Sequence, residues 1–541
     1  MSRPGRIRLR LILPFAGLLF LTFVHSMQTR RYAQISEHRP LPPPLPDPGP
    51  DAATLQLRIV DGRTGRPVSA TVSINGGTQE PRQDPYLAYS LRRTNGERQG
   101  PMRFRKLDDY FFTDGSVSVR VPPGHCVVEV GKGYEYQRSR RVFRLEKNEV
   151  RQATIAVSRW IDMAELGWYS GDTHIHFERD GSNDDQLLVL TSAKDIRYAY
   201  SLSMNTGGYA LGREFESWRQ AHGLGPASEV RRGGYFLSSG QEYRNSSMGH
   251  VTVVLAKDYV PAAGWTADAN LGPSLAVIGD QARELGGYMG LNHGGYYRLE
   301  ADYVGLTGKS DFLELLQLGG YRGLGLDGWY DFLNLGYRWP IVGASDFPYS
   351  RELGDSITYV FSETEPTPRG FMEGVVQGRS FVTSGPMLLV SVNGKGPGKS
   401  LHFPGGEPVA LELEARVRSP LYPVRTLEII WNGRVVSRYF DADGRSIWDH
   451  AERLQVSGSG WVGVRAYGDP GTEAHSNPVY VDVGGRLPFD DDACGQILAR
   501  LEGSIRSALT PEIRDRYRDI HARLKRYRDT RDAEGLAIPR R

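Results

Sequence analysis

Short stretches of alternating hydrophobic and polar positions occupy the early part of the chain. The first covers residues 55–60, a turn follows at Asp61 and Gly62, and the next stretch covers residues 70–74. Successive side chains of a β-strand point to opposite faces, so this period of two predicts strands with one buried face. Because similar stretches continue to about Arg159, we expect a small β-sandwich over residues 54–160.

Strand-like and helix-like stretches alternate in the middle of the chain, from residue 161 to residue 385. Residues 311–316 and 341–344 are rich in apolar side chains and predict buried strands. Residues 274–285 and 368–377 have the pattern of helices. This alternation favours an α/β domain built on a parallel sheet.

Strands return in residues 386–485, where residues 427–431 and 461–465 are the clearest examples, and they predict a second β-sandwich. Residues 486–541 form a helical tail with apolar side chains on one face and Arg and Asp on the other. We expect this helix to dock on the body of the protein; a role at a membrane surface is the weaker alternative. The apolar positions are Ile513, Tyr517, Ile520, Leu524 and Tyr527.

The N-terminal residues have the layout of a targeting element. Arginines precede an apolar stretch at residues 11–24, as in a secretory signal peptide, and the stretch is short for a membrane span of about 20 residues. We expect residues 1–27 to be a signal peptide or an N-terminal membrane anchor, followed by a Pro-rich linker over residues 28–53. The body would then be exported, periplasmic or at the cell surface, with a membrane tether as a further partner.

Composition narrows the classes of partner. The chain has 541 residues, too many for one core, and 66 Lys and Arg against 63 Asp and Glu. The near balance argues against nucleic acid as the main partner, so we expect no nucleic-acid binding. The two cysteines, Cys126 and Cys494, exclude a disulfide framework and a cysteine-based zinc knuckle, and Cys126 lies in an apolar run typical of a buried side chain.

The sequence Gly-Asp-Thr-His-Ile-His at residues 171–176 is the first candidate for chemistry. His174 and His176 are two apart on a predicted strand, so their imidazoles point to the same side. Two neutral imidazoles that converge make half of a transition-metal site, although a His-x-His pair alone also occurs by chance on strands.

Four further residues suit the same site and lie near predicted strand ends beside glycine. Each has an ordinary explanation: a core histidine, a surface glutamate or a turn-forming aspartate. The chain has only 12 histidines, however, and four of them lie at strand ends in one region. Together the set supplies four imidazoles and two carboxylates, enough for two divalent cations. The four added residues are Glu242, His250, His293 and Asp346.

These motifs, in this order, resemble the PHP superfamily of metallohydrolases, and specifically its CehA/McbA-like branch. The matching segments are residues 171–176, 240–250, 292–295 and 343–346, with further similarity at 381–386 and 474–478. The similarity covers residues 160 to 483, and the opening of the first sandwich resembles carboxypeptidase-regulatory-like domains. The resemblance implies a multidomain α/β plus β protein in which a distorted (β/α)7 barrel is flanked by the two sandwiches.

The resemblance also implies roles for the residues. His174, His176 and Asp346 would hold one metal ion, His250 and His293 a second, and Glu242 would bridge them. An Asp-His pair usual in the family is replaced by residues 201–205, and a later histidine by proline. Both belong to a third metal, so we predict two divalent ions, Zn, Mn or Fe. Candidate supporting or extra ligands are Asp172, which could orient an imidazole through its free nitrogen, Asp180, a doubtful remnant of the third site, and Glu314.

No serine or cysteine nucleophile with a paired base is evident in the sequence. The expected chemistry is therefore hydrolysis of an ester-type bond in a small molecule, a phosphoester or a carboxyl or carbamate ester, by metal-bound hydroxide. The alternatives are an exported binding or adhesion protein with structural metals and a catalytically decayed PHP domain. Candidate substrate-binding residues are Arg244, Tyr296, Tyr297 and Arg298.

Overall fold

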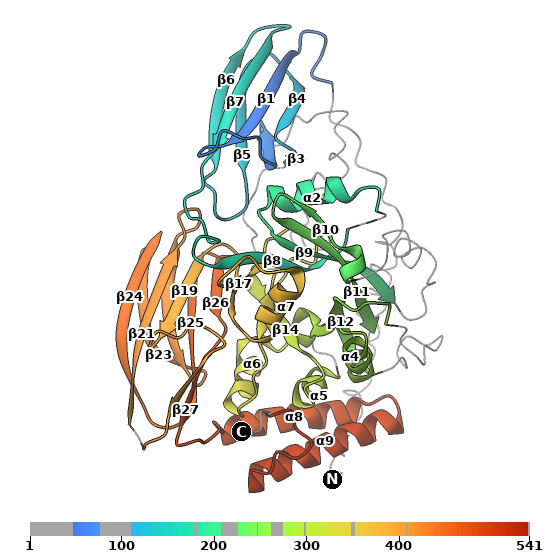
Figure 1. Ribbon diagram of the computed structural model, residues 1–541, viewed down its shortest axis with the longest axis vertical. Coiled ribbons are helices and arrows are strands. Elements are labelled where there is room, and N and C mark those ends of the chain that lie inside the picture. The colour runs from blue at the N-terminus through green and yellow to red at the C-terminus, as the bar shows by residue number, and fades with distance from the viewer. Residues whose placement is uncertain are drawn as a thin grey trace, which may run out of the picture. The chain divides into compact units, whose positions relative to one another are not determined.

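A computed structural model describes residues 47–538, apart from residues 76–109, 178, 180, 207–224, 246, 261–273, 297–298, 348–351 and 407. These residues form a mixed α/β fold in which strands predominate (Figure 1). Residues 1–46 lie outside the described part of the chain, and they include the predicted signal peptide or anchor and most of the predicted Pro-rich linker.

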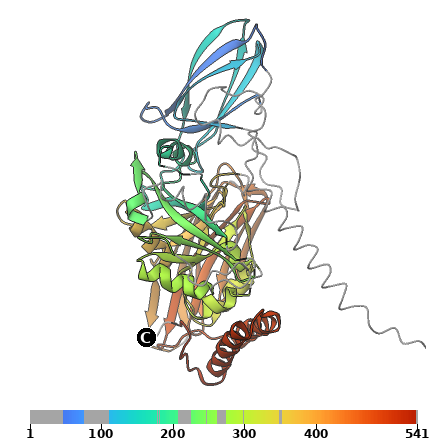
Figure 2. The same ribbon diagram turned by 90° about the vertical axis from the view of Figure 1, so that its right-hand side faces the viewer.

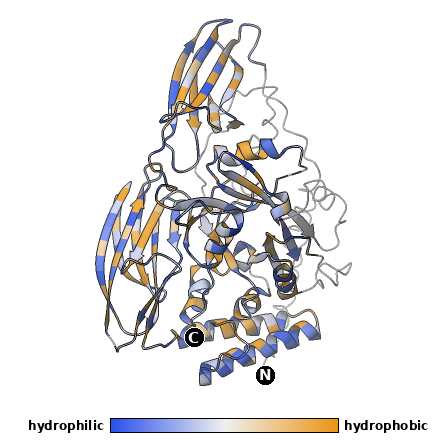
Figure 3. Ribbon diagram, viewed as in Figure 1, coloured by the Kyte–Doolittle hydropathy of each residue, from blue (hydrophilic) through white to orange (hydrophobic). Residues whose placement is uncertain are grey.

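The predicted N-terminal strands form two small sheets that share one hydrophobic core. Hydrophobic and hydrophilic positions alternate along them (Figure 3). The strand β4 shows the consequence, since every second side chain is buried. Cys126 is fully buried in this core, as its apolar surroundings predicted. The strands are β1 (Ala53–Asp61), β2 (Ala70–Ile74), β3 (Phe111–Thr113), β4 (Ser116–Val121), β5 (Gly124–Gly131), β6 (Ser139–Leu145) and β7 (Val150–Val157).

The middle of the chain builds the sheet that carries the candidate site. The strands β8, β9 and β11 pair in parallel, as do β13, β14 and β16. The expected parallel sheet is therefore confirmed in part, because β12 runs antiparallel to both β11 and β13. Only residues 246–248 connect β11 to β12, and so short a link can join only antiparallel neighbours. The strands are β8 (Trp168–Ile175), β9 (Tyr198–Thr206), β10 (Val230–Arg232), β11 (Tyr235–Asn245), β12 (Gly249–Val254), β13 (Tyr288–Leu291), β14 (Phe312–Gln317), β15 (Gly320–Tyr321), β16 (Ile341–Gly343), β17 (Ile357–Phe361) and β18 (Ser380–Thr383).

Both helices predicted in this region are confirmed, and each begins with a side-chain cap. Ser274 accepts a hydrogen bond from the backbone of Ala276 at the start of α4, and Thr367 accepts one from Gly370 at the start of α7. Such caps satisfy backbone N–H groups that have no partner inside the helix. The helices are α2 (Asp184–Ala193), η2 (Gly225–Ser228), α4 (Leu275–Glu284), η4 (Asn292–Gly295), α5 (Ala301–Leu306), α6 (Gly325–Asn334) and α7 (Pro368–Val376).

The segment after β16 returns to the end of β8. The amide of Asp346 donates to the carbonyl of His174 at 2.8 Å, and the amide of His176 donates to the carbonyl of Phe347 at 2.6 Å. These backbone hydrogen bonds form an isolated parallel bridge between Ile175 and Phe347. They place the two chain segments side by side although about 170 residues separate them in sequence.

Most of the strands of residues 387–483 are continuous with the central sheet. The strand β18 pairs with β26, and Asn477 exchanges two hydrogen bonds with the backbone of Ile341, at 2.9 and 3.0 Å. The strands β19, β21 and β24 form a separate three-stranded sheet. The bounds are β19 (Met387–Val392), β20 (Ser400–Phe403), β21 (Val409–Arg418), β22 (Val424–Trp431), β23 (Arg434–Arg445), β24 (Ile447–Val456), β25 (Gly460–Gly468), β26 (Glu473–Ser476) and β27 (Val479–Val483).

The C-terminal tail contains two helices, α8 (Asp491–Ser507) and α9 (Pro511–Thr530), which lie side by side in Figures 1 and 2. The predicted apolar face of α9 is buried, and the tail docks on the body through ion pairs. Arg500 pairs with Asp302 at 3.0 Å and Arg516 pairs with Glu300 at 2.9 Å. The predicted helical tail, residues 486–541, contains both helices, and the sequence analysis identified an apolar face for α9 alone.

The predicted localisation needs correction. Within the described residues no helix is long and apolar enough to cross a membrane. The predicted signal peptide or anchor, residues 1–27, lies outside those residues. We therefore do not carry the expectation of export or of a membrane tether further.

Candidate metal centre

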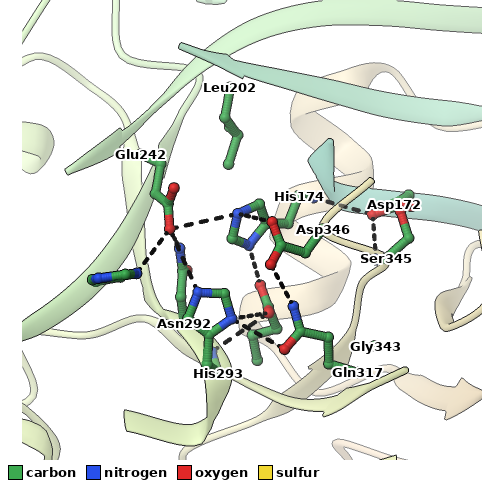
Figure 4. Close-up of polar contacts among 12 residues, drawn as sticks. Asp172, His174, Leu202, Glu242, Asn292, His293, Gln317, Gly343, Ser345 and Asp346 are labelled. Carbon is green, nitrogen blue, oxygen red and sulfur yellow. Dashed lines mark hydrogen bonds and ion pairs between the residues drawn. The ribbon is translucent and has the colours of Figure 1, made fainter. Parts of the chain in front are cut away.

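The candidate ligands come from separate strands and converge on one place. His174 lies near the end of β8 and His176 directly follows that strand, His250 is the second residue of β12, and His293 follows β13. Figure 4 shows His174, Glu242, His293 and Asp346 pointing toward one another. The expectation that Glu242 follows a strand end is wrong, because β11 continues through Ser238, Ser239 and Gly240 to Asn245. A pleated strand turns the Glu242 side chain to one face, and on β11 that face is the one that the histidines share.

Three groups of side chains have ligand atoms within 4.8 Å of one another. Glu242 belongs to two of these groups, and His174 and His293 also belong to two each. Imidazole nitrogens and carboxylate oxygens are donors that Zn, Mn and Fe accept. The groups are His174 with His176 and Glu242; Glu242 with His250 and His293; and His174 with His293 and Asp346.

The pair on β8 presents its Nε2 atoms inward. His174 Nδ1 lies 2.6 Å from Glu314 Oε2, and His176 Nδ1 lies 3.0 Å from the carbonyl oxygen of Leu202. Both partners accept hydrogen bonds, so each Nδ1 carries the proton and, in the neutral ring, each Nε2 is the nitrogen without one. The two Nε2 atoms are 3.0 Å apart. Two nitrogens bound to one tetrahedral zinc ion lie about 3.3 Å apart, so this pair fits a shared cation.

The carboxylate of Glu242 lies between the two sets of histidines. Its Oε2 is 3.4 Å from His176 Nε2, and its Oε1 is 3.3 Å from His250 Nδ1 and 3.5 Å from His293 Nε2. Asp346 completes the first set, because its Oδ1 lies 3.3 Å from His176 Nε2. Glu242 is therefore the carboxylate that the two sets of histidines share.

Asn292 and Gln317 also contact the ligands, and the sequence did not single them out. Asn292 donates to Glu242 Oε1 at 3.2 Å, and Gln317 donates to Asp346 Oδ2 at 3.0 Å. Strict alternation along β14 would place Gln317 on the face opposite to Glu314. The pairing of β14 with β16 shifts register between Glu314 and Leu316, and such a bulge re-aims the side chains beyond it.

Asp172 has a different contact from the one expected. Its Oδ1 accepts the backbone amides of His174 and Ser345, both at 3.1 Å, and its Oδ2 accepts the Ser345 hydroxyl at 2.5 Å. These hydrogen bonds tie the end of β8 to the segment that carries Asp346, and none of them involves an imidazole ring. Burial raises the pKa of the Asp172 carboxyl to about 7, and the three hydrogen bonds oppose that rise.

The charges of the centre stabilise one another. Burial raises the pKa of Glu242, but the nearby charges of Arg244 and His174 outweigh it and hold the pKa well below 4.5. Burial lowers the pKa of His176, but hydrogen bonds to the carboxylates of Asp346 and Glu242 raise it to about 9. Burial lowers the pKa of His250 to about 4, against the opposing effect of Glu242. Ionised carboxylates facing several imidazoles are the donors that a divalent cation requires.

The backbone at two ligands adopts a conformation that L-residues rarely take. His293 has φ 54° and Asp346 has φ 55°. Such left-handed conformations cost free energy outside glycine and gather at functional sites. The residue after His293 must be glycine for a steric reason, because a Cβ on Gly294 would lie 2.1 Å from the carbonyl oxygen of Arg322.

Two of the predicted substrate-binding residues lie at the centre. Arg244 Nε is 3.7 Å from Glu242 Oε2, and the Tyr296 ring stands edge-on to His293, with ring centroids 6.0 Å apart. Tyr296 is 43% exposed, and the side chains of His250 and Asp346 are 21% and 18% exposed, so these parts of the centre reach solvent. The other candidates, Asp180, Tyr297 and Arg298, lie outside the described residues.

Comparisons with known proteins give a limited match. No protein-family model and no curated protein matches the chain. Among solved structures, the novel lesion-specific endonuclease PfuEndoQ from Pyrococcus furiosus is 16% identical, with a TM-score of 0.24, over 36% of this chain and 54% of that one. Endonuclease Q in complex with a 27-mer duplex substrate is 16% identical, with a TM-score of 0.25, over 39% and 56%.

Endonuclease Q is a PHP-superfamily enzyme, the superfamily that the motifs resemble. The chain spans little more than half the length of either endonuclease chain. The CehA/McbA-like branch stays a prediction.

The expectation of no nucleic-acid partner is corrected by this comparison, because both similar structures are endonucleases and one holds a duplex substrate with an abasic lesion. The near balance of charge over 541 residues is an average and does not describe the field at one site. We withdraw the exclusion of nucleic acids.

Proposed function

We propose that this chain is a metal-dependent hydrolase that cleaves an ester-type bond at a centre of two divalent cations. One observation carries the proposal: at His174 and His176 the outer ring nitrogens are occupied by acceptors, while the inner nitrogens are 3.0 Å apart. Paired lone pairs of this kind, beside the carboxylates of Glu242 and Asp346, suit a cation better than they suit a hydrogen-bonded core. His250 and His293 would hold the second cation together with Glu242.

Bound divalent cations supply Lewis acidity to a substrate oxygen and lower the pKa of water toward neutrality. The remaining contributions come from side chains of this chain. Arg244 suits an anionic oxygen of the substrate, because its guanidinium is charged and lies beside the cluster. Tyr296 offers an exposed ring to an apolar or aryl group at the same side.

The described residues of the centre offer no alternative nucleophile of the usual kind. The Ser345 hydroxyl is bound to Asp172, not to an imidazole, and both cysteines are buried among apolar side chains. Cleavage would therefore use activated water, with a phosphoester or a carboxyl or carbamate ester as the substrate bond.

The barrel and the two flanking sandwiches are part of the proposal. The order of pairing β8–β9–β11–β12–β13–β14–β16 supports a closed barrel, because the Ile175–Phe347 bridge returns to β8. The shared core of β1–β7 supports the first sandwich. A barrel would place the ligands at one end of its strands, as α/β folds place their active sites.

The test measures metal content and turnover together. Purified protein loaded with Zn²⁺ or Mn²⁺ is assayed on p-nitrophenyl phosphate, bis(p-nitrophenyl) phosphate and p-nitrophenyl acetate. We expect metal-dependent turnover on at least one ester, reduced to background in His176→Ala and unchanged in His402→Ala, which removes an exposed histidine distant in sequence from the centre. Metal uptake without turnover on any ester would contradict the proposed hydrolase and favour a structural role for the metal.

A further inference from the structure

The side chain of Gln317 lies between two of the proposed ligands. Its Oε1 is 3.1 Å from His293 Nδ1, and its Nε2 donates to Asp346 Oδ2 at 3.0 Å. Gln317 is 4% exposed, so water does not compete freely for either contact. Figure 4 shows the amide of Gln317 with His293 on one side and Asp346 on the other.

The chemistry of the amide fixes the orientation of both neighbours. A carboxylate only accepts hydrogen bonds, so the NH₂ end of Gln317 must face Asp346. The carbonyl end then faces His293, and Nδ1 of that ring must carry a proton to donate to it. With the proton on Nδ1, Nε2 is the unprotonated nitrogen of the neutral ring and the one that can bind a metal ion. This Nε2 lies 3.5 Å from Glu242 Oε1.

The outer and inner oxygens of Asp346 are likewise distinguished by their contacts. Gln317 binds its Oδ2, and its Oδ1 lies 3.4 Å from His174 Nε2 and 3.3 Å from His176 Nε2. We propose that Gln317 is a positioning residue that occupies the outer atoms of His293 and Asp346 and so turns their inner atoms toward the cations. This inference rests on the proposed metal centre and adds to it the residue that joins the two cation positions.

A neutral amide suits this position better than either alternative. Glu314 Oε1 also approaches His293 Nδ1, at 3.3 Å, and already supplies a negative charge there. A second carboxylate in place of Gln317 would face Asp346 with no proton between them, and two anions in a buried site repel each other. An apolar side chain would leave Asp346 Oδ2 without its donor.

Gln241 provides a matched control in the same protein. It is 1% exposed, and its amide also makes two hydrogen bonds, both at 3.2 Å, to the backbone of Val260. It precedes Glu242 in β11, so its side chain points to the opposite face of the strand. Gln241→Met removes a buried amide of the same size without touching any of the proposed ligands.

The experiment compares Gln317→Met, Gln241→Met and the wild type. Affinity for Zn²⁺ is measured by competition with a chromophoric chelator, folding of the metal-free proteins by circular dichroism and thermal melting, and coordination by the visible absorption of Co²⁺-loaded protein. We expect Gln317→Met to lower metal affinity by about 10- to 100-fold, the usual effect of removing a partner of a metal ligand. We also expect it to change the Co²⁺ spectrum, whereas Gln241→Met changes neither although it lowers the melting temperature.

A second measurement does not depend on a variant that folds. In Zn²⁺-loaded wild type with ¹⁵N-labelled histidine, the proton of His293 should be on Nδ1 and the metal on Nε2. A proton on Nε2, or a Gln317→Met protein with the affinity and Co²⁺ spectrum of the wild type, would overturn the positioning role. A wild type that takes up no cation would overturn both this inference and the metal centre, and a wild type that binds metal without turnover would overturn only the proposed hydrolase.

Discussion

Replacing Glu314 by glutamine tests how strongly the centre depends on a fully buried carboxylate. Glu314 Oε2 lies 2.6 Å from His174 Nδ1, and Oε1 lies 3.3 Å from His293 Nδ1. Burial raises the pKa of Glu314, but the charge of His174 and the hydrogen bonds from both histidines outweigh it and lower the pKa from 4.5 to about 2. Glutamine keeps the size of the side chain and removes the charge.

The expected loss follows from that difference in pKa. Each pKa unit corresponds to about 1.4 kcal/mol, so the metal-free Glu314→Gln protein should lose roughly 3 kcal/mol of unfolding free energy at pH 7. Because the folded pKa is below the unfolded value, this contribution is complete above pH 4.5 and disappears as the pH falls toward 2. The affinity for metal should fall as well, by about 10- to 100-fold, because glutamine has one acceptor oxygen for the two Nδ1 atoms, of His174 and His293, that Glu314 faces.

Urea unfolding at pH 7 and at pH 3, with chelator competition for metal affinity, measures both effects. Glu300→Gln is the control, since Glu300 is equally buried and binds Ser274 and Arg516 outside the centre. It should leave metal affinity unchanged. A Glu314→Gln protein with the unfolding free energy and metal affinity of the wild type would refute the role given to this carboxylate.

Three further predictions concern pH, packing and the tail. The pKa of His176 is raised to about 9, so a cation that binds at pH 7 must displace its proton. Calorimetry in buffers of different ionisation enthalpy should show that metal binding releases a proton and that the metal affinity rises up to about pH 9. Identical heats of binding in all buffers would contradict this. Gly171→Ala places a Cβ 2.3 Å from the Phe371 ring, and thermal melting should show a loss of about 1–3 kcal/mol; an unchanged midpoint would show that the ring gives way. Leu524→Ala truncates a fully buried side chain of α9 and should cost about 2–5 kcal/mol in urea unfolding, unless the tail unfolds separately.

Local patterns predicted much of the fold. The alternation in residues 55–60, the apolar run at 311–316 and the amphipathic face of α9 each correspond to an observed element. They could be predicted because period and burial are properties of a few neighbouring residues. The direction of β12 could not be predicted from apolar content, because it follows from the length of the link that precedes it.

The candidate ligands could be predicted from the sequence, but the groups that hydrogen-bond to them could not. His174 and His176 share a face because they are two residues apart on a strand. The outer acceptor for His176 is a backbone carbonyl, that of Leu202, which carries no sequence signal at all. Gln317 reaches the centre only because β14 changes register after Glu314, and strict alternation would assign it to the other face.

The pairing of β18 with β26 has a practical consequence for anyone who shortens this protein. Asn477, directly after β26, holds the backbone at the start of β16, and that strand leads to Asp346. A truncated chain that stops near residue 386 would retain every proposed ligand. It would lose the pairing of β18 with β26 and the two hydrogen bonds that Asn477 makes to the backbone of Ile341. Limited proteolysis should for the same reason leave residues 387–483 attached to the preceding sheet, and a truncated chain that fails to take up metal would not count against the ligands themselves.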